Sequence, residues 1–386
     1  MEVIQVYNLV NTATNEALGI ENLVQENLSN LVDIGTQIFN AEAVDRYVRS
    51  LVNQIGKIIF VSRPYRGGVP SVLMDAWEFG SVLEKITVEL PEATENESWE
   101  LVDGASYDPN IFYKPKVSAK FFNKKVTFEV DMSFTEMQVK QSFQNATQLN
   151  SFLSMLYTAV EKSMTVKTDA LVMRTINNFI GETIYADYEG ADLSSKSGVR
   201  AINLLSLYKA RFTEAANMTA EQAVTTPEFI RFAAYTMANY IDRLTRISTL
   251  FNIGGKDRFT PKDMLHVVML SDFRNAADIY LQSDTFHDAY TALPNAETVP
   301  YWQGSGDDFG FGNVSKINVI TTGNHAVEAG GILAIMFDRD ALGVSNLSRR
   351  VTTNYNAKAE FWNNFYKFDA GYFNDQNENF LVFFVA

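Results

Sequence analysis

The side chains that most often carry enzyme chemistry are few in this sequence and are not grouped. The three histidines, His266, His287 and His325, lie in separate segments, and no two have the spacing that holds a zinc ion. The chain has no cysteine, which excludes disulfides, thiolate metal sites and cysteine nucleophiles. We therefore expect the histidines to have structural roles.

Glycine-rich stretches and serine motifs likewise fail to match known catalytic or cofactor sites. The glycines between Gly304 and Gly312 do not form a dinucleotide-binding fingerprint, and the Gly254-Gly255-Lys256 stretch lacks the first glycine and the Ser or Thr of a P-loop. No Gly-x-Ser-x-Gly nucleophile elbow occurs. The sequence predicts no active site, no cofactor and no metal centre.

Charged side chains are segregated by sign in two neighbouring stretches. The acidic stretch contains Glu84, Glu89, Glu92, Glu95, Glu97 and Glu100. The basic stretch contains Lys114, Lys116, Lys120, Lys124 and Lys125, with no acid among them. Single exposed ion pairs contribute about 0 to 1 kcal/mol, but pairs repeated between many copies can fix their register.

This segregation predicts contacts between copies of the chain. The candidate inter-subunit residues are Glu84, Glu89, Glu92, Lys116, Lys120, Lys124, Lys125, Arg349 and Arg350. The alternative interpretation, solvated charge on a local strand pair, is equally open. Reversal of the lysine charges, followed by an assembly measurement, distinguishes the two.

The acidic stretch belongs to a long β excursion at about residues 63–114. Its best strand is Leu83–Leu90, followed by Pro91 and the polar run to Glu100. A hairpin of this length is not stable alone in water, so it needs another surface, such as a second subunit. Lys116–Phe122 and Lys125–Val130 are expected as the next two strands, joined by a turn at Asn123 and Lys124.

One stretch, residues 145–180, predicts a very long helix. Its apolar residues recur at three- and four-residue spacing, Asn145 and Gln148 can cap its start, and Gly181 marks its expected end. At 1.5 Å per residue such a helix is roughly 50 Å long, far above the average of about 11 to 12 residues. A helix of this length needs a long partner surface.

The rest of the sequence predicts helices at the N-terminus and a mixed α and β region after the long helix. Residues 1–62 are acidic and amphipathic, and they fit either a subdomain packed on its own chain or an arm that reaches a neighbour. Residues 181–375 combine a helix that starts at Pro227 with strands at Leu265–Leu270 and Ile332–Phe337. An apolar strand, Phe380–Val385, ends the chain.

Composition bounds the class of protein. The 386 residues are 46% hydrophobic and 13% aromatic, which is enough for large cores and subunit interfaces. A net charge of -14 disfavours a dedicated nucleic-acid binder. The N-terminal residues do not resemble a secretory signal, no apolar run is long enough to span a bilayer, and we expect no contact with a membrane.

The order of these parts resembles the shell-protein fold of tailed double-stranded DNA bacteriophages. The closing pattern, from Ile335-Met336-Phe337-Asp338-Arg339-Asp340 through Tyr355, Trp362 and Tyr366 to the apolar end, is similar to major capsid proteins of small short-tailed phages. The resemblance implies an α+β fold with four parts. These are an N-terminal arm at 1–62, an extended β-hairpin E-loop at 63–114, a P-domain at 115–180 with the spine helix 145–180, and a mixed α/β A-domain at 181–375. The terminal strand, within 376–386, would rejoin the P-domain sheet.

The resemblance also implies a structural function without catalysis. Copies would assemble as pentamers and hexamers into an icosahedral virion capsid around double-stranded DNA, in the cytoplasm of the bacterial host. Expected partners are a separate scaffolding protein, a portal protein and the packaged DNA, held by proximity only. Two alternatives stay open: an encapsulin-like nanocompartment shell with the same fold, and a cytosolic α/β enzyme with a site in a deep polar pocket.

Overall fold

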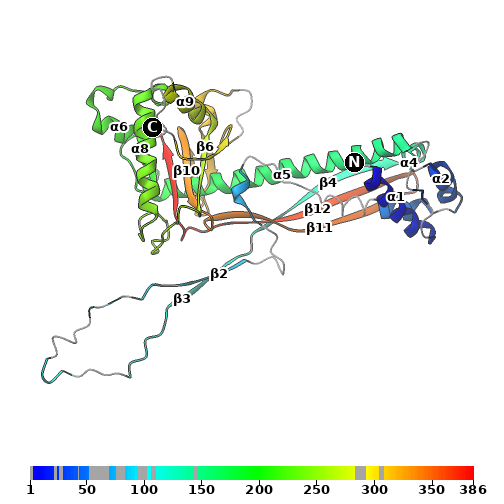
Figure 1. Cartoon of the computed structure of the whole chain (residues 1–386), viewed down its shortest axis with the longest axis horizontal. Helices are drawn as coiled ribbons and strands as arrows, with labels where there is room; N and C mark the ends of the chain where they lie inside the picture. Colours follow the sequence, from blue (N-terminus) through cyan, green and yellow to red (C-terminus); the bar gives the residue numbers. More distant parts are fainter. Residues whose placement is uncertain are drawn as a thin grey trace. The chain divides into compact units, whose positions relative to one another are not determined.

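The computed structural model describes residues 3–20, 24–25, 29–41, 43–51, 69–74, 83–91, 93, 95, 102–105, 110–142, 146–282, 293–303 and 308–386. The chain divides into two compact units (Figure 1). Unit 1 comprises residues 1–78, 125–174 and 344–371, and unit 2 comprises residues 79–124, 175–343 and 372–386. Each unit has its own sheet and its own core.

Unit 1 is built on a sheet with strand order β1-β11-β12-β4. The strands are β1 (Leu73–Met74), β4 (Lys125–Thr135), β11 (Leu342–Asn356) and β12 (Phe361–Asn374). β4 and β12 are antiparallel over eleven residue pairs, from Phe361 opposite Thr135 to Gly371 opposite Lys125. A short helix, α4 (Glu136–Ser142), follows β4, and Thr135 and Gln138 exchange hydrogen bonds at its start.

The N-terminal helices form part of the core of unit 1. They are α1 (Val3–Leu18), α2 (Leu31–Asn40) and a helical segment at 44–51. Their buried side chains pack with residues of β4, β12 and the long helix in one cluster: Val10, Ala13, Leu31, Ile34, Ile38, Tyr47, Val48, Leu51, Phe134, Leu156, Val160, Trp362 and Tyr366. The sequence left two possibilities for this acidic segment, a subdomain packed on its own chain or an arm that reaches a neighbour. The described helices pack on their own chain.

The long helix, α5, runs from Ala146 to Tyr188, so its predicted end at Ile180 is wrong. Gly181 lies inside the helix rather than after it. A Cβ atom at this position would collide with the Cγ2 methyl of Val319 on strand β8 (Ile317–Ile320). The glycine is therefore explained by the close approach of a strand, a contact that helix-ending rules cannot anticipate.

Replacing Gly181 by alanine is expected to destabilise the protein by about 1–2 kcal/mol, because overpacking against Val319 outweighs the better helix propensity of alanine. The free energy of urea-induced unfolding measures the effect. The double variant G181A/V319A removes the collision and is expected to recover most of the lost stability. A single variant as stable as the parent would contradict this account.

Unit 2 is built on a second sheet, with strand order β5-β13-β10-β6-β7. The strands are β5 (Ala201–Asn203), β6 (Leu265–Leu270), β7 (Glu297–Val299), β10 (Ile332–Asp338) and β13 (Phe380–Phe384). β13 is antiparallel to β10 and parallel to β5. The terminal strand therefore joins the sheet of the predicted A-domain, and its predicted return to the P-domain sheet is wrong. Every residue of β10 and β13 is buried, which is typical of central strands.

Unit 2 also contains helices. They are α6 (Leu204–Arg211), α7 (Ala220–Thr225), α8 (Pro227–Leu244), α9 (Ser271–Gln282) and the short α10 (Phe311–Val314). Of these, α6 packs on β13, and α9 packs on β6 and β7. Pro227 occupies the first turn of α8, as predicted, and Phe229, Ile230 and Met237 form its buried face. A small two-stranded sheet pairs β8 with β9 (Ala326–Ala329).

A hairpin formed by β2 (Leu83–Val88) and β3 (Val117–Phe122) completes unit 2. The strands expected at 116–122 and 125–130 are present as β3 and the start of β4, but they do not pair with each other, because β3 pairs with β2 and β4 pairs with β12. The hairpin consequently extends to Phe122, beyond the predicted E-loop limit at residue 114. Figure 1 shows β2 and β3 side by side.

Candidate subunit-interaction site

The β2–β3 hairpin presents two faces of different chemistry. Successive side chains of a strand point to opposite faces, and the burial of β2 alternates accordingly. The inner face, which is the more buried one, carries Leu83, Lys85 and Thr87 of β2 opposite Phe122, Lys120 and Ser118 of β3. The outer face carries Glu84, Ile86 and Val88 opposite Phe121, Ala119 and Val117.

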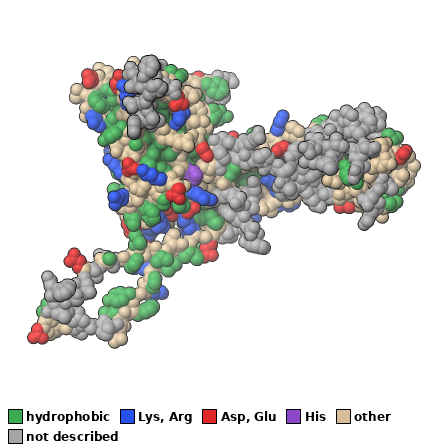
Figure 2. Space-filling view, in the orientation of Figure 1, with side chains coloured by type: hydrophobic (Ala, Val, Ile, Leu, Met, Phe, Trp, Pro, Cys, Tyr) green, Lys and Arg blue, Asp and Glu red, His purple; other side chains and the backbone are tan. Residues whose placement is uncertain are grey.

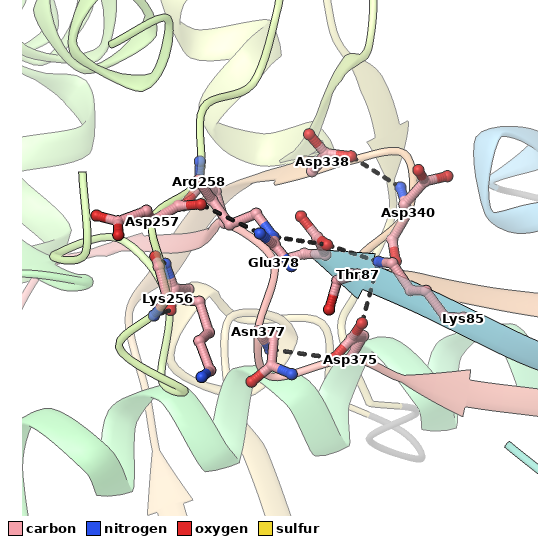
Figure 3. Close-up of polar contacts among 12 residues, drawn as sticks. Lys85, Thr87, Lys256, Asp257, Arg258, Asp338, Asp340, Asp375, Asn377 and Glu378 are labelled. Carbon is pink, nitrogen blue, oxygen red and sulfur yellow. Dashed lines mark hydrogen bonds and ion pairs between the residues drawn. The ribbon is translucent and has the colours of Figure 1, made fainter. Parts of the chain in front are cut away.

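The inner face is held by ion pairs to the turn that precedes β13 (Figure 3). The Lys85 Nζ atom lies 3.0 Å from Asp375 Oδ2 and 2.6 Å from Glu378 Oε1. The Lys120 Nζ atom lies 2.8 Å from Asp375 Oδ1. Arg258 adds its Nε atom, 3.1 Å from Glu378 Oε1. Two carboxylates thus bind three cations, and we call these five residues the hairpin lock.

The hairpin lock shifts the pKa values of Asp375 and Lys85 toward the charged forms. Burial alone would raise the pKa of Asp375, but hydrogen bonds and attraction from Lys120 and Lys85 lower it below its usual value. Burial would likewise lower the pKa of Lys85, but Glu378 and Asp375 raise it. The side chain of Asp375 is only 2% exposed, so this charge depends on its partners.

Apart from Glu84, the outer face is apolar and exposed. Ile86, Val88, Val117 and Phe121 are each 58 to 62% exposed. Figure 2 shows hydrophobic side chains, in green, along the hairpin. Large apolar side chains that gather on one exposed strand face indicate an interaction surface.

A cavity of about 290 Å³ lies beside the hairpin within unit 2. It is lined by residues 120–124, by Asn178 and Glu182 of α5, by Thr322 and by residues at the end of β12. The Glu182 carboxylate accepts hydrogen bonds from Thr322 and from Gln376, whose Nε2 atom is 2.6 Å away. Because the Glu182 carboxylate is already hydrogen-bonded to these two side chains, it is not available as a catalytic base, and we interpret the cavity as a packing space lined by polar groups.

The structure gives several of the predicted charged residues partners within the same chain. Glu89 binds Lys256 at 2.8 Å, in an exposed pair that lowers the pKa of Glu89 through a hydrogen bond and charge attraction. Lys120 belongs to the hairpin lock. On unit 1, Arg350 binds Asp369 at 2.8 Å.

The other predicted charged residues take different positions. Glu84 is exposed on the outer face, directly opposite Phe121. Lys116 is exposed, and its carbonyl accepts a hydrogen bond from the Glu89 amide. Lys124 is exposed between β3 and β4, Lys125 is exposed at the first position of β4, and Arg349 lies on β11. Glu92 lies outside the described residues.

The sequence interpretation missed the acidic half of the hairpin lock and the apolar outer face. Asp375 and Glu378 are far from Lys85 in the sequence, so no local pattern connects them. The outer face had a readable signal, because the alternation in Leu83–Val88 places Glu84, Ile86 and Val88 on one side.

Removal of Arg350 tests how far the charge of Asp369 stabilises unit 1. The surroundings of Asp369 lower its pKa to about 2. Burial would raise this pKa, but hydrogen bonds from Thr127, Arg350 and Ser348 lower it. Because folding lowers the pKa of Asp369, the ionised carboxylate stabilises the folded chain. This contribution to the unfolding free energy is fully present above the ordinary aspartate pKa near 4 and is lost as the pH falls through about 2. We expect R350A to lower the unfolding free energy by about 1 kcal/mol at pH 6 and by less near pH 2.

The control for this prediction is K358A, which removes an exposed cation from the turn between β11 and β12. It is expected to change the unfolding free energy little at either pH. A loss in R350A that stays constant from pH 6 to pH 2 would show that packing, not the charge of Asp369, is responsible.

The described part of the chain lacks metal-binding clusters and membrane-spanning helices. It holds no group of three or more His, Asp or Glu side chains that could bind a metal ion. None of its helices has the length and apolarity needed to cross a bilayer. His325 stacks on Tyr185 and His266 lies beside Phe337, whereas His287 is outside the described residues.

Comparison with known families decides the class of the protein. The chain matches the Phi29-like phage major capsid proteins over residues 10–384. It belongs to this family. The predicted resemblance to tailed-phage shell proteins is confirmed, and the chain is a capsid protein of the phage virion with the phage capsid fold, not an enzyme.

Similar solved structures are also phage structures. The capsid structure of Staphylococcus phage Andhra has 8% identity and a TM-score of 0.49, and the alignment covers 84% of this chain and 86% of that one. A chain from the structure of head fiber and inner core protein gp22 of native bacteriophage P68 has 11% identity, the same coverage and a TM-score of 0.49. The capsid structure of cyanophage P-SCSP1u has 10% identity, coverage of 84% and 90%, and a TM-score of 0.43. Comparison with curated protein sequences gives no significant match.

Proposed function

We propose that this capsid protein assembles as pentamers and hexamers into an icosahedral shell that encloses double-stranded DNA. The observation that carries the proposal is the outer face of the β2–β3 hairpin. Its four large apolar side chains are exposed to solvent in the single chain. In a protein whose family forms capsids, a second copy of the chain is the partner that fits this face.

The hairpin takes the role of the E-loop in this proposal. The long helix α5 serves as the spine, the helices within 1–62 serve as the N-terminal arm, and the sheet with β13 belongs to the A-domain. The exposed residues Glu84, Lys124 and Lys125 supply charge contacts between copies. Opposite charges at the rim of an apolar contact favour one register over others.

The remaining partners follow from the same role. A separate scaffolding protein guides assembly in the cytoplasm of the host, and a portal protein occupies one vertex. The net charge of -14 repels the phosphate backbone on average, which suits a wall along which packaged DNA moves without being held.

Negative-stain electron microscopy of the purified chain tests the proposal. The chain is imaged alone and together with the product of the gene just upstream, as a candidate scaffolding protein. We expect closed shells, tubes or six-fold rings in at least one of the two samples. A chain that stays monomeric in both, at concentrations where shell proteins associate, would contradict the proposed assembly.

A further inference from the structure

We propose that Asp375 and Glu378 are positioning residues that fix the direction of the β2–β3 hairpin before it meets a neighbouring subunit. This inference rests on the proposed role of the hairpin as a subunit contact. Asp375 and Glu378 belong to the turn between β12 and β13, so they lie outside the contact surface itself.

The register of the hairpin creates the need for such residues. Lys85 and Lys120 are direct cross-strand partners, and both project from the inner face. Like charges directly opposite each other destabilise a strand pair. Asp375 removes this conflict, because each of its carboxylate oxygens binds one of the two ammonium groups.

The two carboxylates are held by a hydrogen-bonded turn, whereas the lysine side chains are long and have many rotamers. The Asp375 amide donates a hydrogen bond to the Ala341 carbonyl at 2.7 Å, and the Asn377 amide donates to Asp375 Oδ1 at 3.1 Å. The Gly254 amide donates to the Gln376 carbonyl at 2.7 Å, and a Cβ atom on Gly254 would collide with the Asn377 side chain. The turn therefore sets where the lysines, and with them the hairpin, must lie.

A second ion pair at the base of the hairpin provides a natural comparison. Glu89 and Lys256 approach each other at 2.8 Å, as closely as Lys120 and Asp375 do, but both side chains are about 40% exposed. Exposed pairs contribute little, whereas breaking a buried pair leaves an uncompensated charge. The hairpin lock should hold the hairpin, and the exposed pair should not.

Spin-label distances in the full-length, unassembled chain test the position of the hairpin. The sequence contains no cysteine, so A119C on β3 and A238C on α8 can be labelled without background. We compare the parent with D375N, with the neutral set K85M/K120M/D375N and with the control E89Q. Asparagine keeps the Oδ1 atom that accepts from the Asn377 amide, so the turn is retained in D375N.

The variants have a specific expected order. The parent and E89Q should show one narrow distance distribution. D375N takes the carboxylate partner from Lys120, which then faces Lys85 held by Glu378 alone, and the undocked population should rise by at least about tenfold. The neutral set removes the repulsion together with the attraction, so its undocked population should be smaller than that of D375N.

Several outcomes would overturn the inference. A D375N distribution as narrow as that of the parent, or a neutral set more open than D375N, would show that repulsion between the lysines is not controlled by Asp375. Normal shell yield and shape from an opened D375N hairpin would show that its direction is irrelevant to assembly. Failure of the parent itself to form shells would instead contradict the proposed function, so the two failures are distinguishable.

Discussion

The double substitution F121E/V117E is expected to abolish shell assembly while leaving the chain folded. Both side chains lie on the outer face of the hairpin and are about 60% exposed in the single chain, so the cost to the folded chain is limited to solvent-screened repulsion between the new carboxylate at position 121 and Glu84 directly opposite. In an assembled shell the same positions would be buried against a neighbour, where an unpaired carboxylate is costly.

The expected size of the effect follows from the energies of buried interface residues. A central aromatic residue commonly contributes 2 kcal/mol or more, and each factor of ten in affinity corresponds to about 1.4 kcal/mol. We therefore expect the concentration needed for assembly to rise by at least about a hundredfold. Light scattering during assembly and sedimentation velocity measure it, and circular dichroism confirms that the variant is folded.

The matched control keeps the face apolar. F121L/V117I changes shape at the same two positions but adds no charge, and it should assemble at a concentration close to that of the parent. If F121E/V117E forms shells as readily as F121L/V117I, the outer face is not a subunit contact. The exposed apolar residues would then need another partner.

The substitution W362A is expected to have the largest effect on the stability of unit 1. Trp362 is almost fully buried, its ring lies 4.8 Å from that of Tyr355 and 6.1 Å from that of Phe134, and its Nε1 donates to Asp45 Oδ1 at 3.1 Å. It thereby joins the sheet to the helical segment at 44–51. Truncation of a buried tryptophan to alanine costs about 3–5 kcal/mol.

Two measurements separate the loss of packing from the loss of the hydrogen bond. Urea-induced unfolding gives the free-energy change, and hydrogen exchange reports whether the helices between residues 3 and 51 lose protection. W362F keeps most of the apolar volume but cannot donate to Asp45, so it should cost about 1–2 kcal/mol. Unchanged protection of the N-terminal helices in W362A would contradict their packing on this side chain.

The local sequence pattern was sufficient to predict individual helices and strands of unit 2. Strand β6 occupies the predicted residues Leu265–Leu270, and helix α8 starts at Pro227 as predicted. These features depend on side-chain periodicity and on the missing amide of proline, which act over a few residues. The absence of catalytic motifs was also readable, and it agrees with membership of a structural family.

Pairing between distant segments was not readable in the same way. The strands at 116–122 and 125–130 do not pair with each other although a turn joins them, and the prediction that the last strand would return to the sheet of β4 is wrong. A strand shows in its sequence only which of its faces is apolar, and many partners satisfy that pattern. The partner is selected by the packing of whole sheets.

The sequence by itself determined the class of the protein, the long helix, the alternating hairpin strand and the segregation of charge between residues 84 and 125. The tertiary structure decided which charges meet. It places Asp375 between Lys85 and Lys120, and Lys256 beside Glu89, although the partners are more than 160 residues apart in the sequence in each case. Coulombic attraction does not depend on position in the sequence, so only the fold, by bringing the turn before β13 under the hairpin, could select these partners.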